Sequence, residues 1–293
     1  MNIRTALIAC ATFLMICHPG SGQIFVVDQD LGTIGEYTLT GSAINTRFIS
    51  GLHQPEGIAI SGENLFVANF GNGTIGKYTT TGATLDASFI SGLNQPIGIA
   101  LSGNTLFVAN FGTGTIGAYD ATSGQAIAAS LISGLTNPFG ITTSGDNLFV
   151  VNAGDGTVGE YTLAGTTVNN SLISSLPGPR GIAISGSNFF ITLNAGGMIG
   201  EYTSAGETVN SSLVTGLSGP IGVAVLGGNI FVTNNNNGTV GEFTVTGGTV
   251  NSALISGLAG PTFLAIVPEP ATPLLLFVGA SGLLAMNKLR RQG

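Results

Sequence analysis

The stretch ISGLHQPEGI at residues 49–58 decides the fold, because the chain repeats it five more times. Related decapeptides follow at residues 90–99, 132–141, 173–182, 214–223 and 255–264. A second marker, Thr-Ile-Gly or a close variant, keeps step with it and places glycines at positions 35, 76, 117, 159, 200 and 241. A fixed period of 41 or 42 residues indicates a repeat architecture, in which each unit packs only against its neighbours.

Each unit reads as four short strands joined by turns. In the second unit we expect strands over residues 57–61, 64–69, 73–79 and 83–90. The first two are dominated by β-branched and aromatic residues, which favour strands, and the junctions hold the glycine, asparagine and serine that turns need. No segment of residues 23–267 keeps an apolar stripe at helical spacing. Such a unit is typical of a β-propeller blade, which packs against neighbours on both faces.

The two ends of the repeat array indicate a closed ring. The array begins at Gln23, in the second strand of a unit, and ends over residues 261–266 with a lone first strand. These fragments complete one blade only if they pair, which hides the edges that an open array exposes. An open β-solenoid, the alternative, would need polar caps that neither end supplies. We therefore predict an all-β, six-bladed β-propeller over residues 23–267, with four-stranded blades, closed by its N- and C-terminal strands.

The repeat also resembles the NHL-type family of six-bladed propellers. The resemblance rests on LNQPIGIA at residues 93–100 followed by LFVAN at residues 106–110, and it extends over all six units. These are scaffold positions, so the resemblance implies the fold and brings no activity with it.

Residues 1–22 have the features of a secretory signal peptide. Arg4 precedes an apolar run, and small residues lie just before Gln23. The alternatives are a membrane anchor, for which the run is short, and lipidation at Cys17, against which the bulky preceding residue argues. Both cysteines lie in this segment, so we expect no thiol and no disulfide in the processed chain.

The C-terminal segment, residues 268–293, carries three features in a fixed order. These are the motif Pro268-Glu269-Pro270, an uncharged segment over residues 271–287, and a basic tail over residues 288–293 with Lys288, Arg290 and Arg291. The uncharged segment is about the minimum length for a transmembrane helix, and the basic tail should stay cytoplasmic. A plain C-terminal anchor is the alternative.

This order resembles the PEP-CTERM sorting signal. The resemblance implies a Gram-negative bacterium, export through the inner membrane, transient anchoring by the helix over residues 271–287, and cleavage by an exosortase-type enzyme. That enzyme would recognise the Pro-Glu-Pro motif. We therefore expect the protein at the cell surface or outside the cell.

The charge of the chain excludes a nucleic-acid partner. Only 7% of residues are charged, and the predicted ring holds three basic residues against thirteen acidic ones, a formal charge of −10. A nucleic-acid-binding surface would need a basic patch, which three cations cannot form.

A site for one ligand should lie where the six copies differ. At the position after the turn proline only Glu56 and Arg180 are charged. They are three blades apart, so we expect them to face each other across the central channel, where they could orient a polar ligand. Solvated rim charges are the alternative interpretation.

The loops that follow the second strands carry oxygen-bearing side chains, among them Asp28, Asn69, Asn110 and Asn152. Such loops could hold Ca²⁺, as in lactonase-like propellers, but no calcium-loop motif is present, and asparagine and aspartate also suit turns. We assign no metal ligand and no cofactor, and Ca²⁺ stays the alternative. Together with Glu56 and Arg180, these four residues are the predicted ligand-binding set at the channel mouth.

No catalytic residue is assigned. His53 is the only histidine after residue 22, and the ring has no nucleophile motif. The predicted function is that of a non-catalytic binding or structural module at the cell surface, with an extracellular polysaccharide or a surface molecule as partner. The alternative is a secreted lactonase-like or lyase-like propeller with a metal at the channel mouth.

Overall fold

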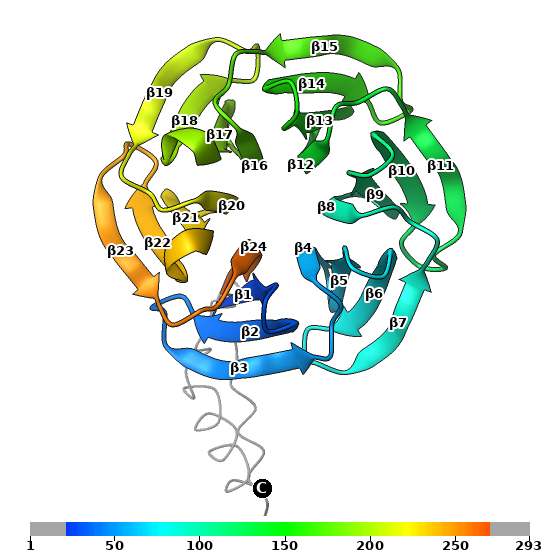
Figure 1. Ribbon diagram of the computed structural model, residues 1–293, viewed down its shortest axis with the longest axis horizontal. Helices are drawn as coiled ribbons and strands as arrows, with labels where there is room; N and C mark the ends of the chain where they lie inside the picture. Colours follow the sequence, from blue (N-terminus) through cyan, green and yellow to red (C-terminus); the bar gives the residue numbers. More distant parts are fainter. Residues whose placement is uncertain (1–21, 270–293) are drawn as a thin grey trace, which may run out of the picture. The chain divides into compact units, whose positions relative to one another are not determined.

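The computed structural model describes residues 22–269. Within them, the compact unit Gly22–Pro268 is a ring of six four-stranded antiparallel sheets (Figure 1). The fold predicted from the repeats is therefore confirmed. The predicted signal peptide and the predicted segments over residues 271–287 and 288–293 lie outside the described residues, apart from residue 22. In residues 22–269 no helix is long and apolar enough to cross a membrane.

We name the six sheets blades A to F. Blade A consists of β24 (Pro261–Val267), β1 (Gln23–Asp28), β2 (Thr33–Thr38) and β3 (Ala43–Ser50). Blade B consists of β4 (Pro55–Ser61), β5 (Asn64–Asn69), β6 (Thr74–Thr79) and β7 (Thr84–Ile90). Blade C consists of β8 (Pro96–Ser102), β9 (Thr105–Asn110), β10 (Thr115–Asp120) and β11 (Ala126–Ile132).

Blade D consists of β12 (Pro138–Ser144), β13 (Asn147–Asn152), β14 (Thr157–Thr162) and β15 (Thr167–Ile173). Blade E consists of β16 (Pro179–Ser185), β17 (Asn188–Leu193), β18 (Met198–Thr203) and β19 (Thr208–Val214), with the short 3₁₀ helix η1 (Asn194–Gly196) after β17. Blade F consists of β20 (Pro220–Leu226), β21 (Asn229–Asn234), β22 (Thr239–Thr244) and β23 (Thr249–Ile255), with η2 (Asn235–Asn237) after β21. The two 3₁₀ turns were not predicted from the sequence.

The second strand of each blade is buried on both faces, which explains its continuous apolar sequence. In β5, Leu65 and Val67 pack with residues of blade A such as Phe25, whereas Phe66 and Ala68 pack with residues of blade C. Successive side chains of a strand point to opposite faces, so one strand supplies both interblade cores. Each blade is thus stable only between two neighbours, as the repeat pattern predicts.

The marker glycines are required by an aromatic ring two residues further along. A Cβ placed on Gly76 would lie 2.6 Å from the ring of Tyr78, because that ring covers the glycine. The same arrangement recurs in every blade, with Phe243 in place of tyrosine in blade F. The glycine therefore makes room for a ring that fills the gap between strands.

A glutamate recurs at one position of the third strand in four blades and has a structural role there. Each accepts a hydrogen bond of 2.6–2.7 Å from an amide at the start of the second strand of its own blade; the pairs are Glu36–Gln23, Glu160–Asn147, Glu201–Asn188 and Glu242–Asn229. These residues belong to the scaffold.

The ring is closed by β24, which pairs antiparallel with β1 from Gln23↔Val267 to Asp28↔Pro261. The Asp28 carboxylate adds to this closure. It accepts hydrogen bonds from the backbone N–H groups of Ala259 (2.9 Å) and Gly260 (3.1 Å), more than 200 residues away in the chain. Ring closure by the terminal strands is therefore confirmed.

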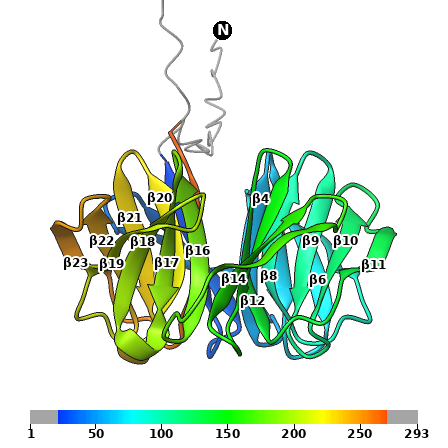
Figure 2. The ribbon, with the colours of Figure 1, turned by 90° about the horizontal axis from the view of Figure 1, so that it is seen from above.

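The ring has two different faces, which Figure 2 presents from the side. The turns that enter the first strands and the loops that follow the second strands lie together on one face, which we call the mouth face. In blade B they are joined by hydrogen bonds from Phe70 N–H to the Gln54 carbonyl and from Gly71 N–H to the His53 carbonyl. The antiparallel strand directions place Gln23 and Val267 on the opposite face. We call it the hairpin face, because it carries the hairpins that join the first strand of a blade to the second and the third to the fourth.

We expect Asp28→Ala to destabilise ring closure by about 1–3 kcal/mol, because the change removes a charged acceptor and leaves the N–H groups of Ala259 and of the buried Gly260 without this partner. The free energy of unfolding in urea measures the loss. Asp28→Asn is the matched control, since asparagine occupies this position in four other blades, and it should cost less. Equal losses for the two variants would contradict the assigned role.

Candidate functional site

The mouth of the channel is built from two rings of equivalent positions. The first ring is the residue after each turn proline; from blade A to blade F it reads Thr262, Glu56, Ile97, Phe139, Arg180 and Ile221. The second ring is the first residue after each second strand and reads Gln29, Phe70, Phe111, Ala153, Asn194 and Asn235. We call these two rings the mouth. Figure 1 shows the first strands, from which the first ring comes, surrounding the centre of the molecule.

Four phenylalanines form a continuous cluster at the mouth. Phe70 and Phe111 lie 6.5 Å apart between ring centroids, Phe111 meets Phe139 edge-on at 6.4 Å, and Phe139 stacks on Phe263 at 5.9 Å. Strands β12 and β24 lie three blades apart in the ring, so the last pair spans the channel. The Arg180 guanidinium carbon lies 4.7 Å from the centroid of Phe139. A cation on an aromatic surface is a recognised binding arrangement.

Phe263 is a departure from the repeat. The equivalent residue in the other five blades is glycine, and a Cβ on Gly57 would collide with the backbone carbonyl of Ile97 in the next blade. Blade A carries a side chain at this position although its bulge has the same register as in the other blades. Thr262 is buried there and donates a hydrogen bond of 3.0 Å to the Glu56 carbonyl, and the next side chain, Phe263, meets Phe139.

Glu56 is buried, with 7% of its surface exposed. Its Oε1 accepts a hydrogen bond of 2.5 Å from Nε2 of Gln29, and its Oε2 has no hydrogen-bond partner among residues 22–269. Burial raises the pKa of Glu56 from 4.5 to about 8, an effect that the nearby Arg180 charge partly offsets. An unpaired carboxylate is costly to bury, so this side chain is mainly protonated at neutral pH.

Arg180 is half-buried, and burial lowers its pKa, while the charge of Glu56 acts in the opposite direction. Its guanidinium still keeps its charge at any ordinary pH. With Glu56 protonated, Arg180 supplies the one formal charge of the first ring. The mouth is therefore mildly cationic, although the ring as a whole is acidic.

Glu56 and Arg180 were predicted to face each other across the central channel, and the structure places aromatic rings in that channel. The strands that carry the two charged residues, β4 and β16, do lie three blades apart. The stacked Phe139–Phe263 pair crosses between them, however, with β4 on one side and β16 on the other. The charge of each residue still acts on the pKa of the other, and Arg180 is the more exposed of the two.

The other four predicted site residues, Asp28, Asn69, Asn110 and Asn152, are buried and bonded within the scaffold. Asp28 joins blade A to the closing turn. Each asparagine donates from Nδ2 to the threonine hydroxyl at the start of the third strand of its own blade; the pairs are Asn69–Thr74, Asn110–Thr115 and Asn152–Thr157. These bonds fix the loops, so we leave the four residues out of the proposed site.

His53 is exposed and lies beside the mouth rather than in it. With Gln29, Asp30 and Gln54 it lines a hollow of about 430 Å³ between blades A and B. Residues 22–269 contain no cluster of three histidine, cysteine, aspartate or glutamate side chains that could hold a metal ion.

The sequence analysis did not identify the aromatic cluster. A signal for it was present, because Phe263 stands where the other five turns have glycine and Phe139 stands at the position compared for charge. A comparison by side-chain size at these positions would have found both residues.

Comparisons with known proteins show the fold and no family. No protein-family model and no curated protein matches the chain. Many solved structures resemble it. A chain of the nidogen/laminin complex has a TM-score of 0.74 at 18% identity, with 85% of this chain and 100% of that chain covered.

Two similar structures are of propeller lyases. A streptogramin B lyase has a TM-score of 0.63 at 18% identity, covering 85% of this chain and 88% of its own. A catalytically inactive virginiamycin B lyase from Staphylococcus aureus with quinupristin has a TM-score of 0.63 at 17% identity, covering 87% and 94%. These likenesses confirm the propeller, and identities this low say nothing about activity.

The pKa of Glu56 predicts how stability depends on pH. Between its ordinary value of 4.5 and about 8, the folded protein keeps a proton that the unfolded chain has released. The stabilisation that Glu56 contributes is complete below pH 4.5 and is lost as the pH rises through about 8. We expect the free energy of unfolding in urea to fall more steeply with pH in the natural protein than in Glu56→Gln, by about 1.4 kcal/mol per pH unit over this window. Parallel profiles would contradict the assignment.

Proposed function

We propose that the protein is an exported, surface-held propeller that binds a small ligand at the mouth and catalyses no reaction. The observation that carries this proposal is the Arg180 guanidinium on the Phe139 ring, next to Phe111 and Phe263. Scaffold residues recur in the repeat, whereas these residues break it. Phe139 itself is buried, and Arg180, Phe111 and Phe263 are half-buried beside it. A charged group next to partly exposed aromatic rings supports a binding role more than a structural one.

The chemistry of the mouth supports a ligand with an anionic group on an apolar body. Arg180 offers a planar, bidentate donor to a carboxylate or phosphate. The partly exposed rings of Phe111 and Phe263 offer an apolar surface to the apolar body of the ligand. Since Glu56 is mainly protonated at neutral pH, it does not repel an anion there.

The sorting signal remains part of this proposal. We propose that the motif Pro268-Glu269-Pro270, the helix over residues 271–287 and the basic tail direct the protein through the inner membrane to an exosortase-type enzyme. The ring leaves its C-terminal end, Val267, on the hairpin face. A chain held by that end would present the mouth away from its attachment, toward an extracellular polysaccharide or a surface partner.

The alternative is a lyase-like or lactonase-like enzyme. It is favoured by the fold shared with streptogramin B lyase and by the orphan Oε2 of Glu56, because a buried carboxyl with a pKa of about 8 suits proton transfer. A metal-dependent version would need ligands that converge on one point. Stabilisation of the protein against heat by Ca²⁺, absent with Mg²⁺, would favour this alternative over the binding module.

The mouth site is tested by a small-molecule and glycan binding screen on the natural protein, Arg180→Ala and Arg47→Ala. Arg47 lies exposed on the outer strand β3, so its variant controls for the loss of one positive charge. We expect aryl carboxylates such as phenylacetate to bind and Arg180→Ala to weaken them at least tenfold, because a charged hydrogen-bonded contact is lost. Equal binding by all three proteins would remove the mouth as a site.

Mass spectrometry of the protein recovered from the cell surface or medium tests the two ends. We expect a mature chain that begins near Gln23 and lacks the tail from Lys288 to Gly293, since the sorting enzyme would cut near the Pro-Glu-Pro motif. Exported protein with an intact tail would overturn the sorting-signal proposal and leave the mouth proposal standing.

A further inference from the structure

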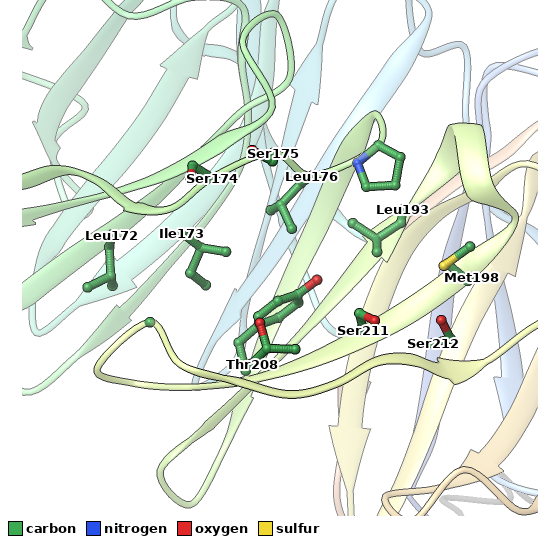
Figure 3. Close-up of a pocket in the computed structure, with 13 residues that line it drawn as sticks. Leu172, Ile173, Ser174, Ser175, Leu176, Leu193, Met198, Thr208, Ser211 and Ser212 are labelled. Atoms are coloured by element: carbon green, nitrogen blue, oxygen red, sulfur yellow. The ribbon is translucent and has the colours of Figure 1, made fainter.

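A pocket lies between blades D and E, away from the mouth (Figure 3). Its volume is about 490 Å³, which is within the range of small-molecule sites. Equivalent gaps between blades B and C and between blades F and A measure about 320 and 220 Å³. The repeat thus builds a gap at this position in several blades, and the gap beside blade E is the largest of these three.

Blade E and the turn that leads into it depart from the repeat at several positions around this gap. Ser175 stands where the other five units have glycine, and its φ of +61° is a left-handed conformation that disfavours a side chain. Open space surrounds the equivalent glycines, so the serine side chain is accommodated. A strained residue kept in one copy of a repeat suggests a use for that residue beyond the scaffold.

Three residues on the floor of this pocket differ together from the residues that form a polar bridge in blade B. In blade B, Asn69 Oδ1 accepts from the backbone N–H of His53 at 3.4 Å, and Asn69 Nδ2 donates to Thr74. In blade E the acceptor is Leu193, the turn residue is Pro177, which has no N–H, and the threonine is Met198. The three changes remove both donors and acceptors, leave nothing unpaired, and make the floor apolar.

Six of the other residues that line the pocket carry hydroxyl groups. These come from Ser174, Ser175, Tyr202, Thr208, Ser211 and Ser212. Figure 3 shows the labelled serines around the apolar side chains of Leu176 and Leu193. No aspartate, glutamate, lysine, arginine or histidine lines the pocket, so it has no partner for a charged ligand.

From this geometry we infer that the pocket between blades D and E binds a neutral carbohydrate. A sugar ring offers hydroxyls that both donate and accept, matching serine, threonine and tyrosine hydroxyls, and an apolar C–H face that suits Leu193, Met198 and the ring of Tyr202. A charged ligand would lose its hydration without compensation. The site is independent of Arg180, so it can fail or hold regardless of the mouth proposal.

The probes are D-glucose, D-galactose, D-mannose and N-acetyl-D-glucosamine, tested singly against the purified protein by saturation-transfer NMR. The main variant, Pro177→Ser/Leu193→Asn/Met198→Thr, restores residue types that other blades carry, so its fold should survive. We expect at least one sugar to bind the natural protein and to bind this variant at least fivefold more weakly. Binding of glucuronate in preference to glucose would overturn the neutral class.

Two further variants separate a site from a structural effect. Ser175→Gly restores the residue of the other units. It should raise the melting temperature of the protein and weaken its binding of the sugar. Tyr119→Phe removes the equivalent hydroxyl from the gap between blades B and C and should leave binding unchanged. The inference is overturned if none of the four sugars binds, if the triple variant binds undiminished, or if Tyr119→Phe loses as much binding as the triple variant.

Discussion

The pairing of β24 with β1 is the constraint on which the rest of the structure depends. It brings Val267 beside Gln23 and completes blade A from the two ends of the ring. Once the ring is closed, every second strand must be apolar on both faces, because each blade is covered by two neighbours. The aromatic ring that covers each marker glycine and the turn glycine that faces the next blade follow from the same crowding.

This closure also separates scaffold from function. A residue required by packing should recur, as the marker glycine does in every blade and the glutamate–amide pairs do in four of them. Arg180, Phe263 and Ser175 do not recur, and each works against its local scaffold. Arg180 is a half-buried cation, Phe263 replaces a glycine that the other blades keep in a crowded position, and Ser175 adopts a left-handed backbone. We therefore place binding at the mouth and between blades D and E.

The sequence was sufficient for the architecture because the repeat period, the turn residues and the two incomplete end units together admit one closed ring. It was not sufficient for the site. Whether Asn69 faces a ligand or a neighbouring threonine depends on side-chain directions in a loop, and the sequence does not contain these directions. Glu56 was predicted to face Arg180 across the channel, and its hydrogen bond to Gln29 of another blade could not be seen in the sequence. The stacking of Phe263 on Phe139 likewise joins blades A and D, which are far apart in the sequence.

The most direct test of the claim that departures from the repeat mark the binding sites is a crystal of the protein soaked in a neutral monosaccharide. The six interblade gaps then serve as internal controls for one another within one crystal. We expect density for the sugar between blades D and E and in no other gap. Density in all six gaps, or at equal occupancy in the gaps that keep the repeat residues, would contradict that claim.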